Sequence, residues 1–361
     1  MKTKRKILLV LVSLLGALAL YLLLWPVPIE PEAWTPPAAP TLEGAFAKNE
    51  RLSGVKRLPA GAGHKPEGVA IDREGRIYSG MEDGRIVRWP NAESAPQDFA
   101  ATGGRPLGMD FDREGNLIVA DAIKGLLSIN PQGAVTILSA EAEGVPFRCT
   151  NDVDIAADGT IYFTDASSRF PLSVYKQDLF EHRGNGRLLA YEPASKRTRV
   201  VLPGLYFANG VAVSPDQSFL LVVETGKYRV RRVWLTGERK GASEILIDNL
   251  PGFPDNISSN GNDKFWLALV TPRSSLLDRM LSRPFLRKVV LRLPEFLQPA
   301  PERYGFVLGL NRDGQVVANL QDPSGASFAQ ISNVLEYQGQ LYLGSIGEDS
   351  VGQIRIPSEG R

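Results

Sequence analysis

Four oxygen-bearing side chains occupy corresponding places in an internal repeat, each directly before a run of β-forming residues. They are Glu67, Asn151, Asn209 and Asp255. Each one alone fits a simple turn, because Asn-Gly and Asp-Asn are ordinary turn formers. Their shared position indicates instead that the fold gathers them, and carboxylate and amide oxygens are the ligands that Ca²⁺ prefers. Zinc is disfavoured because the set contains no histidine or cysteine.

A calcium ion held in this way predicts metal-assisted hydrolysis. The ion would act as a Lewis acid on a carbonyl or phosphoryl oxygen and stabilise the charge that develops there. Calcium acidifies water only modestly, so a carboxylate has to assist near neutral pH. Asp255 is the candidate general base or nucleophile, since one of its two oxygens can remain free of the metal.

Other reactive side chains give weaker signals. The single cysteine, Cys149, would need a histidine partner to act as a nucleophile, and the chain has only His64 and His182. A buried small apolar residue is the simpler interpretation of Cys149. A serine hydrolase is excluded at the motif level, because no Gly-x-Ser-x-Gly elbow lies on an α/β pattern.

The repeat that must position the ring consists of an apolar strand, a turn and a second apolar strand. Its copies begin at Gly68, Gly108, Asp152, Gly210, Asp255 and Ile331. Apolar residues alternate around turns that contain Asp, Asn or Gly, which is typical of antiparallel hairpins. Further β-like runs follow, so each copy, at roughly one sixth of 320 residues, is about the size of one four-stranded blade.

These copies predict an all-β fold, a six-bladed β-propeller over residues 43–361. A β-sandwich is disfavoured, because sandwich strands do not normally recur as near-copies. The stretch around residues 45–58 is strand-like and would complete the last blade. In such a ring the four positions converge on the axis.

Two insertions interrupt the repeat, at residues 169–186 and at about 273–304, and predict short helical lids over the active face. The second insertion has helix-like apolar spacing with interleaved basic residues: Arg279, Arg283, Arg287, Lys288 and Arg292. Segment 274–297 is interpreted either as a solvated lid packed on the propeller or as an amphipathic segment that also contacts an anionic membrane.

Candidates to line a substrate pocket follow from the phase of the repeat and from the first insertion. They are Arg105, Phe147, Phe207, Phe253 and His182. Packing at the core or rim is an equally good interpretation of the first four, and a solvated loop position is the alternative for His182.

The N-terminus predicts a membrane anchor. A basic tail, residues 1–6, precedes an uncharged apolar run, residues 7–25, which is about long enough to cross a hydrocarbon core of ~30 Å as a helix. The basic tail favours a cytoplasmic N-terminus, which places the propeller outside: periplasmic in a bacterium, luminal or extracellular in a eukaryote. A cleaved signal peptide is the alternative, although Pro26-Val27-Pro28 does not resemble a cleavage site. Residues 26–42 are proline-rich and predict a semi-rigid extended linker.

The charge balance argues against a nucleic-acid partner. Lys and Arg total 41 against 40 for Asp and Glu, so the chain has no overall field that would attract a polyanion. The sequence carries no signal for an oligomeric state.

Three long motifs resemble the strictosidine synthase-like branch of the gluconolactonase and paraoxonase propellers. They are FRCTNDVDIAADGTIYFTDASS from Phe147, FANGVAVSPDQSFLLVVETGKYRVRRVWL from Phe207 and LPGFPDNISSNGNDKFWLALVTPR from Leu250. The resemblance covers roughly residues 45–356 and implies one calcium ion on the axis of a six-bladed propeller. The ligands that it implies are Glu67, Asn151, Asn209 and Asp255, with Asn256 as a fifth.

The chain also departs from these relatives. Paraoxonases place a histidine before the glycine that opens the second blade, and here that position is Leu107. Strictosidine synthase itself condenses an amine with an aldehyde, uses a late glutamate and needs no metal. We therefore predict a calcium-dependent arylesterase or lactonase acting on a small-molecule ester or lactone. A non-enzymatic binding propeller with a structural calcium ion and a strictosidine-type condensation are the alternatives.

Overall fold

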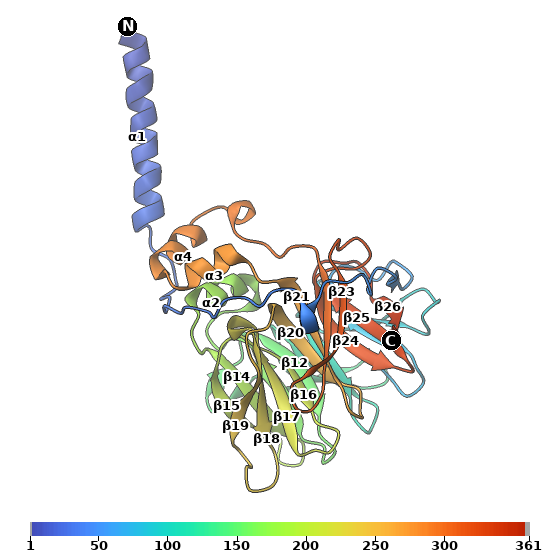
Figure 1. The fold of residues 1–361 in the computed structure, drawn as a ribbon. Coiled ribbons are helices and arrows are strands. Elements are labelled where there is room, and N and C mark those ends of the chain that lie inside the picture. Colours follow the sequence, from blue (N-terminus) through green and yellow to red (C-terminus); the bar gives the residue numbers. More distant parts are fainter. Residues whose placement is uncertain (1, 358–361) are drawn as a thin grey trace.

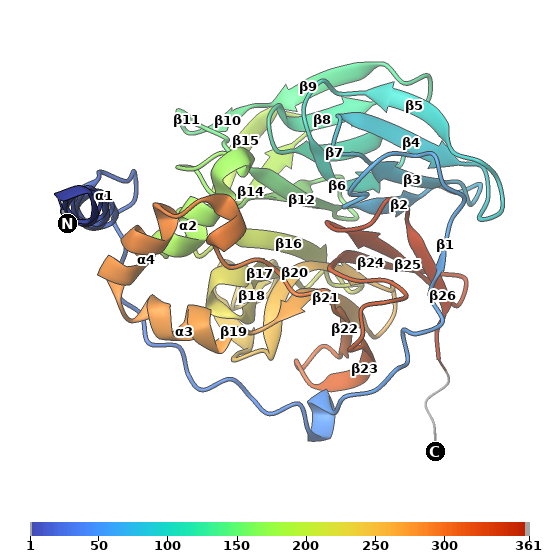
Figure 2. The ribbon, with the colours of Figure 1, turned by 90° about the horizontal axis from the view of Figure 1, so that it is seen from above.

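The computed structural model describes residues 2–357, in which a helix stands apart from a ring of β-sheets (Figure 1). In this described part of the chain, six four-stranded antiparallel sheets surround a common axis (Figure 2). The prediction of a six-bladed β-propeller is therefore confirmed. The helix, α1 (Lys2–Leu24), is long and apolar enough to cross a membrane, a property that a signal sequence shares.

Five blades are built from strands that run in chain order from the axis outward, and the sixth takes its outermost strand from the N-terminal part of the chain. The innermost strands are β2 (Val69–Ile71), β6 (Pro106–Phe111), β12 (Thr150–Ile155), β16 (Ala208–Val213), β20 (Gly252–Ser259) and β24 (Ile331–Tyr337). The second strands are β3 (Ile77–Gly80), β7 (Leu117–Asp121), β13 (Ile161–Asp165), β17 (Phe219–Glu224), β21 (Phe265–Pro272) and β25 (Gln340–Ser345). The third strands are β4 (Arg85–Trp89), β8 (Gly125–Ile129), β14 (Gly186–Glu192), β18 (Arg229–Trp234), β22 (Gly305–Leu310) and β26 (Gly352–Arg355). The outermost strands are β5 (Gln97–Ala101), β9 (Val135–Ser139), β15 (Arg197–Leu205), β19 (Ser243–Ile247), β23 (Val316–Asp322) and β1 (Lys56–Arg57).

Apolar side chains between neighbouring blades form the core. The second strands are buried on both faces, which explains their nearly continuous apolar sequences. Trp89, Trp266 and Phe163 are among the largest side chains that are completely buried. Burial of each such side chain stabilises the fold by roughly 1.5–3 kcal/mol.

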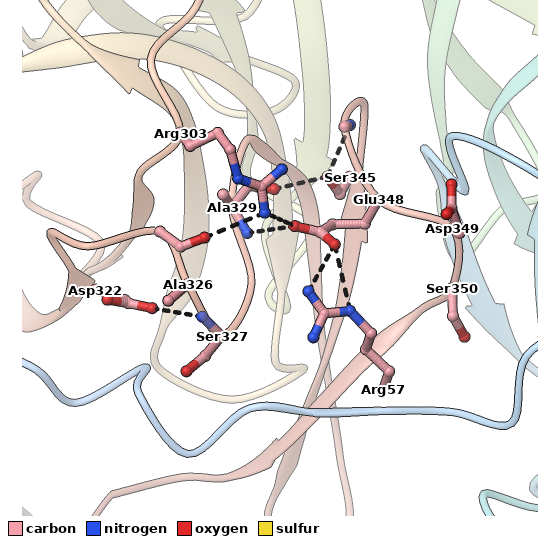
Figure 3. Close-up of polar contacts among 12 residues, drawn as sticks. Arg57, Arg303, Asp322, Ala326, Ser327, Ala329, Ser345, Glu348, Asp349 and Ser350 are labelled. Carbon is pink, nitrogen blue, oxygen red and sulfur yellow. Dashed lines mark hydrogen bonds and ion pairs between the residues drawn. The ribbon is translucent and has the colours of Figure 1, made fainter.

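The ring closes where the N-terminal strand β1 joins the last blade. Lys56 pairs with Gln353 and Arg57 with Gly352, as predicted for the stretch around residues 45–58. The Glu348 carboxylate reinforces this closure, because it accepts hydrogen bonds from Arg57 Nη2 at 2.7 Å and from Arg303 Nη2 at 2.6 Å (Figure 3).

Replacing Glu348 by glutamine is expected to lower the free energy of unfolding by about 1–3 kcal/mol, because a buried carboxylate that bridges two guanidinium groups would lose its charge. Denaturant unfolding of the full chain in detergent measures the change. The control is Glu74→Gln, which removes an exposed partner of Arg76. Equal unfolding midpoints for the two variants would contradict the role of Glu348 in closing the ring.

The two insertions form short helices on one face of the ring, as predicted. The first contains η2 (Leu172–Val174) and α2 (Tyr175–Glu181), and the second contains α3 (Ser275–Leu281), α4 (Pro284–Leu291) and η4 (Glu295–Leu297). Ser274 caps α3 by accepting a hydrogen bond from the Leu277 N–H, and Pro284 opens α4 at a position that needs no N–H donor. Together we call these helices the lid. Two other short 3₁₀ helices are η1 (Gly44–Phe46) and η3 (Thr225–Lys227), and β10 (Glu141–Ala142) pairs with β11 (Val145–Pro146).

Residues 26–42 are extended but packed, and we call them the strap. Ile29 is buried in a cluster with Phe180 of α2 and Met280 of α3. The Glu32 N–H donates to the Glu181 carbonyl at 2.9 Å, and the Trp34 N–H donates to the Leu281 carbonyl at 3.0 Å. The strap therefore fastens the lid, and it continues along the outside of the ring towards η1 (Figure 2).

Candidate metal centre

The four predicted ligands lie at the axial ends of innermost strands, and three of them occupy β-bulges. The pairing register shifts between Thr150 and Val153, between Ala208 and Val211, and between Pro254 and Ile257. Asn151, Asn209 and Asp255 fall within these shifts. A bulge adds an unpaired residue and re-aims its side chain, which is the local reason that these strands present polar groups towards the axis.

Threonine hydroxyl groups of the second blade strand and the following turn join neighbouring blades at this level. Thr164 Oγ1 accepts from the Asp152 N–H at 3.1 Å and donates to the Asn209 carbonyl at 2.5 Å. Thr225 Oγ1 accepts from Asn209 Nδ2 at 3.1 Å and donates to the Pro254 carbonyl at 2.6 Å. Because Thr225 holds the amide nitrogen of Asn209, the amide oxygen remains available as a ligand.

Glu67 is held on the opposite side by a buried arginine. Its Oε2 atom accepts from Arg105 Nη2 at 3.0 Å, and Ser332 Oγ donates to its backbone carbonyl at 2.9 Å. Arg105 also donates to the Lys65 carbonyl at 3.0 Å, which fixes the guanidinium in place. Burial raises the pKa of Glu67, and the ion pair with Arg105 opposes this rise.

Several buried oxygen atoms of the predicted ligands and of the neighbouring Asn256 lack any hydrogen-bond partner among residues 2–357. They include Oδ1 of Asn151, Asn209, Asp255 and Asn256. An unpaired buried acceptor costs roughly 1–3 kcal/mol, so such atoms rarely occur together without a ligand. A cation bound among them would remove this cost, and the donor set therefore fits calcium.

The electrostatics also fit a divalent cation. Burial raises the pKa of Asp255 well above its usual range, and the nearby charges of Glu67 and Asp152 add to the effect. Burial likewise raises the pKa of Asp152 to about 8. Glu67, Asp152 and Asp255 carry three negative charges when ionised against one positive charge on Arg105, which leaves two for the cation.

The donors are mainly amides rather than a cluster of acids. Within the described residues, no group of three or more His, Cys, Asp or Glu side chains is arranged to hold a metal ion. A cation held here would therefore depend on the neutral oxygens of Asn151 and Asn209 as well as on Glu67 and Asp255, a donor set that only a hard, oxygen-preferring cation would suit.

A cavity of about 200 Å³ lies between the ring and the lid. Asn209 and Asp255 belong to its lining. Its other walls are mostly apolar and come from the lid, the blades and the segment after η4: Tyr175, Leu179, Phe180, Phe207, Tyr228, Phe253, Val270, Leu277, Met280, Leu281, Pro299, Ala300 and Pro301. Any ligand here would therefore contact mostly apolar side chains and, at one end, the polar side chains of Asn209 and Asp255.

The predicted pocket residues divide into two groups. Phe207, Phe253 and His182 line the cavity, whereas Arg105 and Phe147 do not. Phe147 packs edge-on against Phe163 at 5.4 Å, in the core between two blades. The phase of the repeat places Phe147 near the axial end of its strand but does not determine which side of the blade its ring covers.

His182 is a buried, neutral group in the cavity wall. It is only 3% exposed, its ring stacks on Trp34 of the strap at 4.6 Å, and its Nε2 atom has no partner among the described residues. Burial, followed by the charges of Lys227, Arg287 and Arg229, lowers the pKa of His182 to about 3. The ring is therefore an uncharged hydrogen-bonding group at physiological pH.

The depressed pKa of His182 predicts a pH-dependent stability. Below pH 6.5 the unfolded chain binds a proton at this residue while the folded chain does not, so stability present above pH 6.5 is lost as the pH falls towards 3. Between pH 7 and pH 5 this loss amounts to about 2 kcal/mol. Unfolding curves of wild type and His182→Gln at both pH values test this, with the exposed His64→Gln as the control. Equal losses in all three proteins would contradict the buried neutral state.

Comparison with known proteins identifies the class to which this fold and site belong. Residues 151–238 match the model of the strictosidine synthase family, and residues 44–89 match the model of the strictosidine synthase-like N-terminal region. The chain belongs to the strictosidine synthase-like family, as its motifs predicted.

Within that family, the chain is similar to adipocyte plasma membrane-associated proteins. It is 34% identical to the one from Rattus norvegicus, over 96% of this chain and 97% of that protein. It is also 38% identical to Protein STRICTOSIDINE SYNTHASE-LIKE 10 of Arabidopsis thaliana, over 78% of this chain and 82% of that protein.

Solved structures of other six-bladed propellers share the fold. A gluconolactonase of Xanthomonas campestris matches with a TM-score of 0.61 at 18% identity, covering 92% of this chain and 99% of that chain. The calcium-binding protein regucalcin of Agrobacterium tumefaciens matches with a TM-score of 0.57 at 15% identity, covering 85% and 93%. At these identities the likeness shows the fold alone.

Proposed function

We propose that this protein is a calcium-dependent hydrolase of small esters or lactones that acts in the cavity beneath the lid. The observation that carries the proposal is that two of the predicted metal ligands also line the cavity. Asn209 and Asp255 both line the apolar cavity and both present an unpaired, buried oxygen atom. A substrate carbonyl in the cavity would therefore lie beside the cation.

The residues of this chain would divide the work as follows. Glu67, Asn151, Asn209 and Asp255, with Asn256 as a fifth ligand, would hold calcium, which supplies Lewis-acid stabilisation to a carbonyl oxygen. Asp255 would take the proton from the attacking water or attack the carbonyl directly. Thr225 keeps the amide of Asn209 oriented with its oxygen towards the site.

The walls of the cavity favour a small, apolar substrate. Phe207, Phe253 and Leu277 would bury the acyl or ring portion and exclude bulk water, which strengthens the electrostatic interactions at the floor. The cavity is smaller than the roughly 300–1,000 Å³ that is typical of sites for drug-sized ligands. A substrate of about the size of a lactone or a short ester would therefore fit. Solved propellers with the same fold include a gluconolactonase and a calcium-binding protein, so the proposed chemistry is compatible with this architecture.

The location of the site is part of the same proposal. The basic residues at the start of α1 favour a cytoplasmic N-terminus, so the propeller and its cavity would lie on the outer side of the membrane. The substrate would then be met outside the cytoplasm.

A direct assay tests the proposed function. Full-length protein in detergent would be mixed with phenyl acetate and with a series of γ- and δ-lactones, with calcium, with chelator, and with calcium restored. Turnover that disappears with chelator and returns with calcium is expected. Retained calcium without turnover of any of these substrates would favour a binding propeller in place of the enzyme.

One observation favours a second candidate, the condensation of an amine with an aldehyde. Strictosidine synthase uses a glutamate late in its chain, and Glu302 is a late glutamate that lines this cavity. The sequence repeat does not single out Glu302, because this residue lies within an insertion that has no counterpart in the other blades.

The variant Glu302→Gln separates the two chemistries. We expect ester or lactone hydrolysis to stay within about twofold of wild type, because Glu302 is exposed at the cavity edge and is not among the ring oxygens. A loss of more than about tenfold in kcat would assign the chemistry to Glu302 and contradict the role of Asp255.

A further inference from the structure

The lid carries an unusual concentration of exposed apolar side chains. They are Leu276, Phe285, Leu286, Phe296 and Leu297, and all lie within one segment of the second insertion. Phe296 is the most exposed, at 83%. Elsewhere on the described propeller, fewer exposed large apolar residues occur in any one segment, for example Val135 and Ile137 on β9 and Ile245 on β19. Five exposed large apolar side chains within one segment are typical of an interaction surface.

The charged residues of the lid that remain free are basic. Arg279 and Arg283 are exposed, and Lys288 is half-buried. The acidic residues are engaged: Asp278 binds Arg273 at 2.8 Å, and Glu295 binds Lys176 at 2.9 Å. The lid therefore combines aromatic and aliphatic groups with positive charge, the composition of segments that lie in the interface of an anionic membrane.

The end of α1 is fastened to the same lid. Arg292, directly after α4, donates from Nε to the Trp25 carbonyl at 2.6 Å and from Nη1 to the Leu22 carbonyl at 2.8 Å. Tyr21 Oη donates in return to the Arg292 carbonyl at 3.1 Å. Because α1 is long enough to cross a bilayer, these bonds place the lid where that helix meets the membrane surface.

The strap limits how far the propeller can move away from this surface. Ile29 is already buried against α2 and α3, only a few residues after the end of α1. Arg287, which is completely buried, donates to the carbonyls of Phe180 and Glu32 and ties α4 to α2 and to the strap. Figure 1 shows α1 leaving the ring on the side of the lid, opposite the blades.

We propose that the lid is an interfacial element whose residues 276–297 lie in the headgroup region of the bilayer that α1 crosses, with Phe285, Phe296 and Leu297 in its apolar boundary and Arg279, Arg283 and Lys288 on anionic headgroups. The partner is an anionic phospholipid surface. The proposal does not depend on hydrolysis, because it rests on the exposed face of the lid and on its attachment to α1.

Depth measurements on the full chain in liposomes test the proposal. Cysteine introduced as Phe296→Cys would carry a fluorescent label, and Ile137→Cys on β9 is the matched control, since that side chain is also exposed, at 58%, but lies on an outer strand. The native Cys149 is fully buried, so labelling is selective. We expect doxyl-labelled lipids to quench the label at 296 at least threefold more than the label at 137. Equal quenching would overturn the proposal, and so would protection of the label at 296 from both lipid and aqueous quenchers, which indicates a protein partner.

The charge of the lid is tested in the same liposomes. With phosphatidylcholine alone and with 30% phosphatidylserine added, roughly the content that gives a strongly negative surface, we expect quenching at 296 to rise at least twofold with the anionic lipid. The double variant Arg279→Glu, Arg283→Glu should abolish this rise and leave the emission in detergent unchanged. A signal that responds neither to the anionic lipid nor to the double variant would overturn the assignment to an anionic surface.

Discussion

Replacing Asp255 by asparagine is expected to lower kcat/KM for ester or lactone hydrolysis by about 10²–10⁴-fold, the range that loss of a general base produces. Asp255 is the residue at which the ring and the cavity meet, and its Oδ1 atom has no protein partner among the described residues. Asparagine keeps the shape and one oxygen donor but removes the basic group. Steady-state kinetics at saturating calcium, with phenyl acetate and with a lactone, measure the effect.

A second aspartate, on the innermost strand β12, provides the control. Asp154→Asn removes a carboxylate that accepts from the Val213 N–H at 2.6 Å and does not line the cavity. Its activity should stay within about threefold of wild type, since changes away from a site act mainly through stability. Undiminished hydrolysis by a folded Asp255→Asn protein would leave the proposed mechanism without its base.

Removal of calcium is expected to destabilise the whole propeller as well as to stop hydrolysis. Without the ion, the carboxylates of Glu67 and Asp255 are both buried, and the charge of Glu67 adds to the cost of ionising Asp255. A ligand present at 1,000 times its dissociation constant stabilises the folded state by about 4 kcal/mol. Thermal unfolding in chelator, in calcium and in magnesium measures this term.

The variant Asn209→Leu identifies the ring as the source of that stability. Leucine fills a similar volume but has no oxygen, so most of the rise in Tm with calcium should be lost while the Tm in chelator changes little. Magnesium should stabilise the wild type less than calcium, because it demands octahedral geometry at shorter distances. If calcium and chelator give the same Tm for the wild type, the proposed metal centre is absent.

The propeller and the ring could be predicted because their signals are local. Alternation of apolar residues defines each hairpin. A polar residue two positions before Val153, Val211 and Ile257 marks where the bulges aim side chains at the axis. The chain therefore reveals a radial repeat without any knowledge of distant contacts.

The cavity walls and the state of the lid could not be predicted in the same way, because they depend on packing between segments that are far apart. Arg287 reads as one of several interleaved basic residues, but it is fully buried and binds the carbonyls of Phe180 and Glu32. Likewise, Phe147 packs against Phe163 in the core between two blades. Periodicity gives a residue's phase but not its partner.

The docking of the strap was also beyond the sequence, since a proline-rich segment is expected to be exposed whether or not it finds a groove. The contacts of Trp34 explain why this segment is docked on the propeller and not free in solvent. Its ring stacks on His182, and Lys227 lies over its face at 4.1 Å, so a single aromatic residue joins the strap to the lid and to a blade.

This arrangement decides where the propeller can be cut away from α1 without loss of the strap contacts. A protease cut between Trp25 and Ile29 would release a propeller that keeps every strap contact made by Ile29, Glu32 and Trp34. A cut after Trp34 would shed those residues with the helix and leave α2 and α3 without their clasp. The apolar helix α1 and the strap that holds the roof of the cavity are thus one continuous piece of chain, and cleavage at the second position would loosen the roof as it frees the propeller.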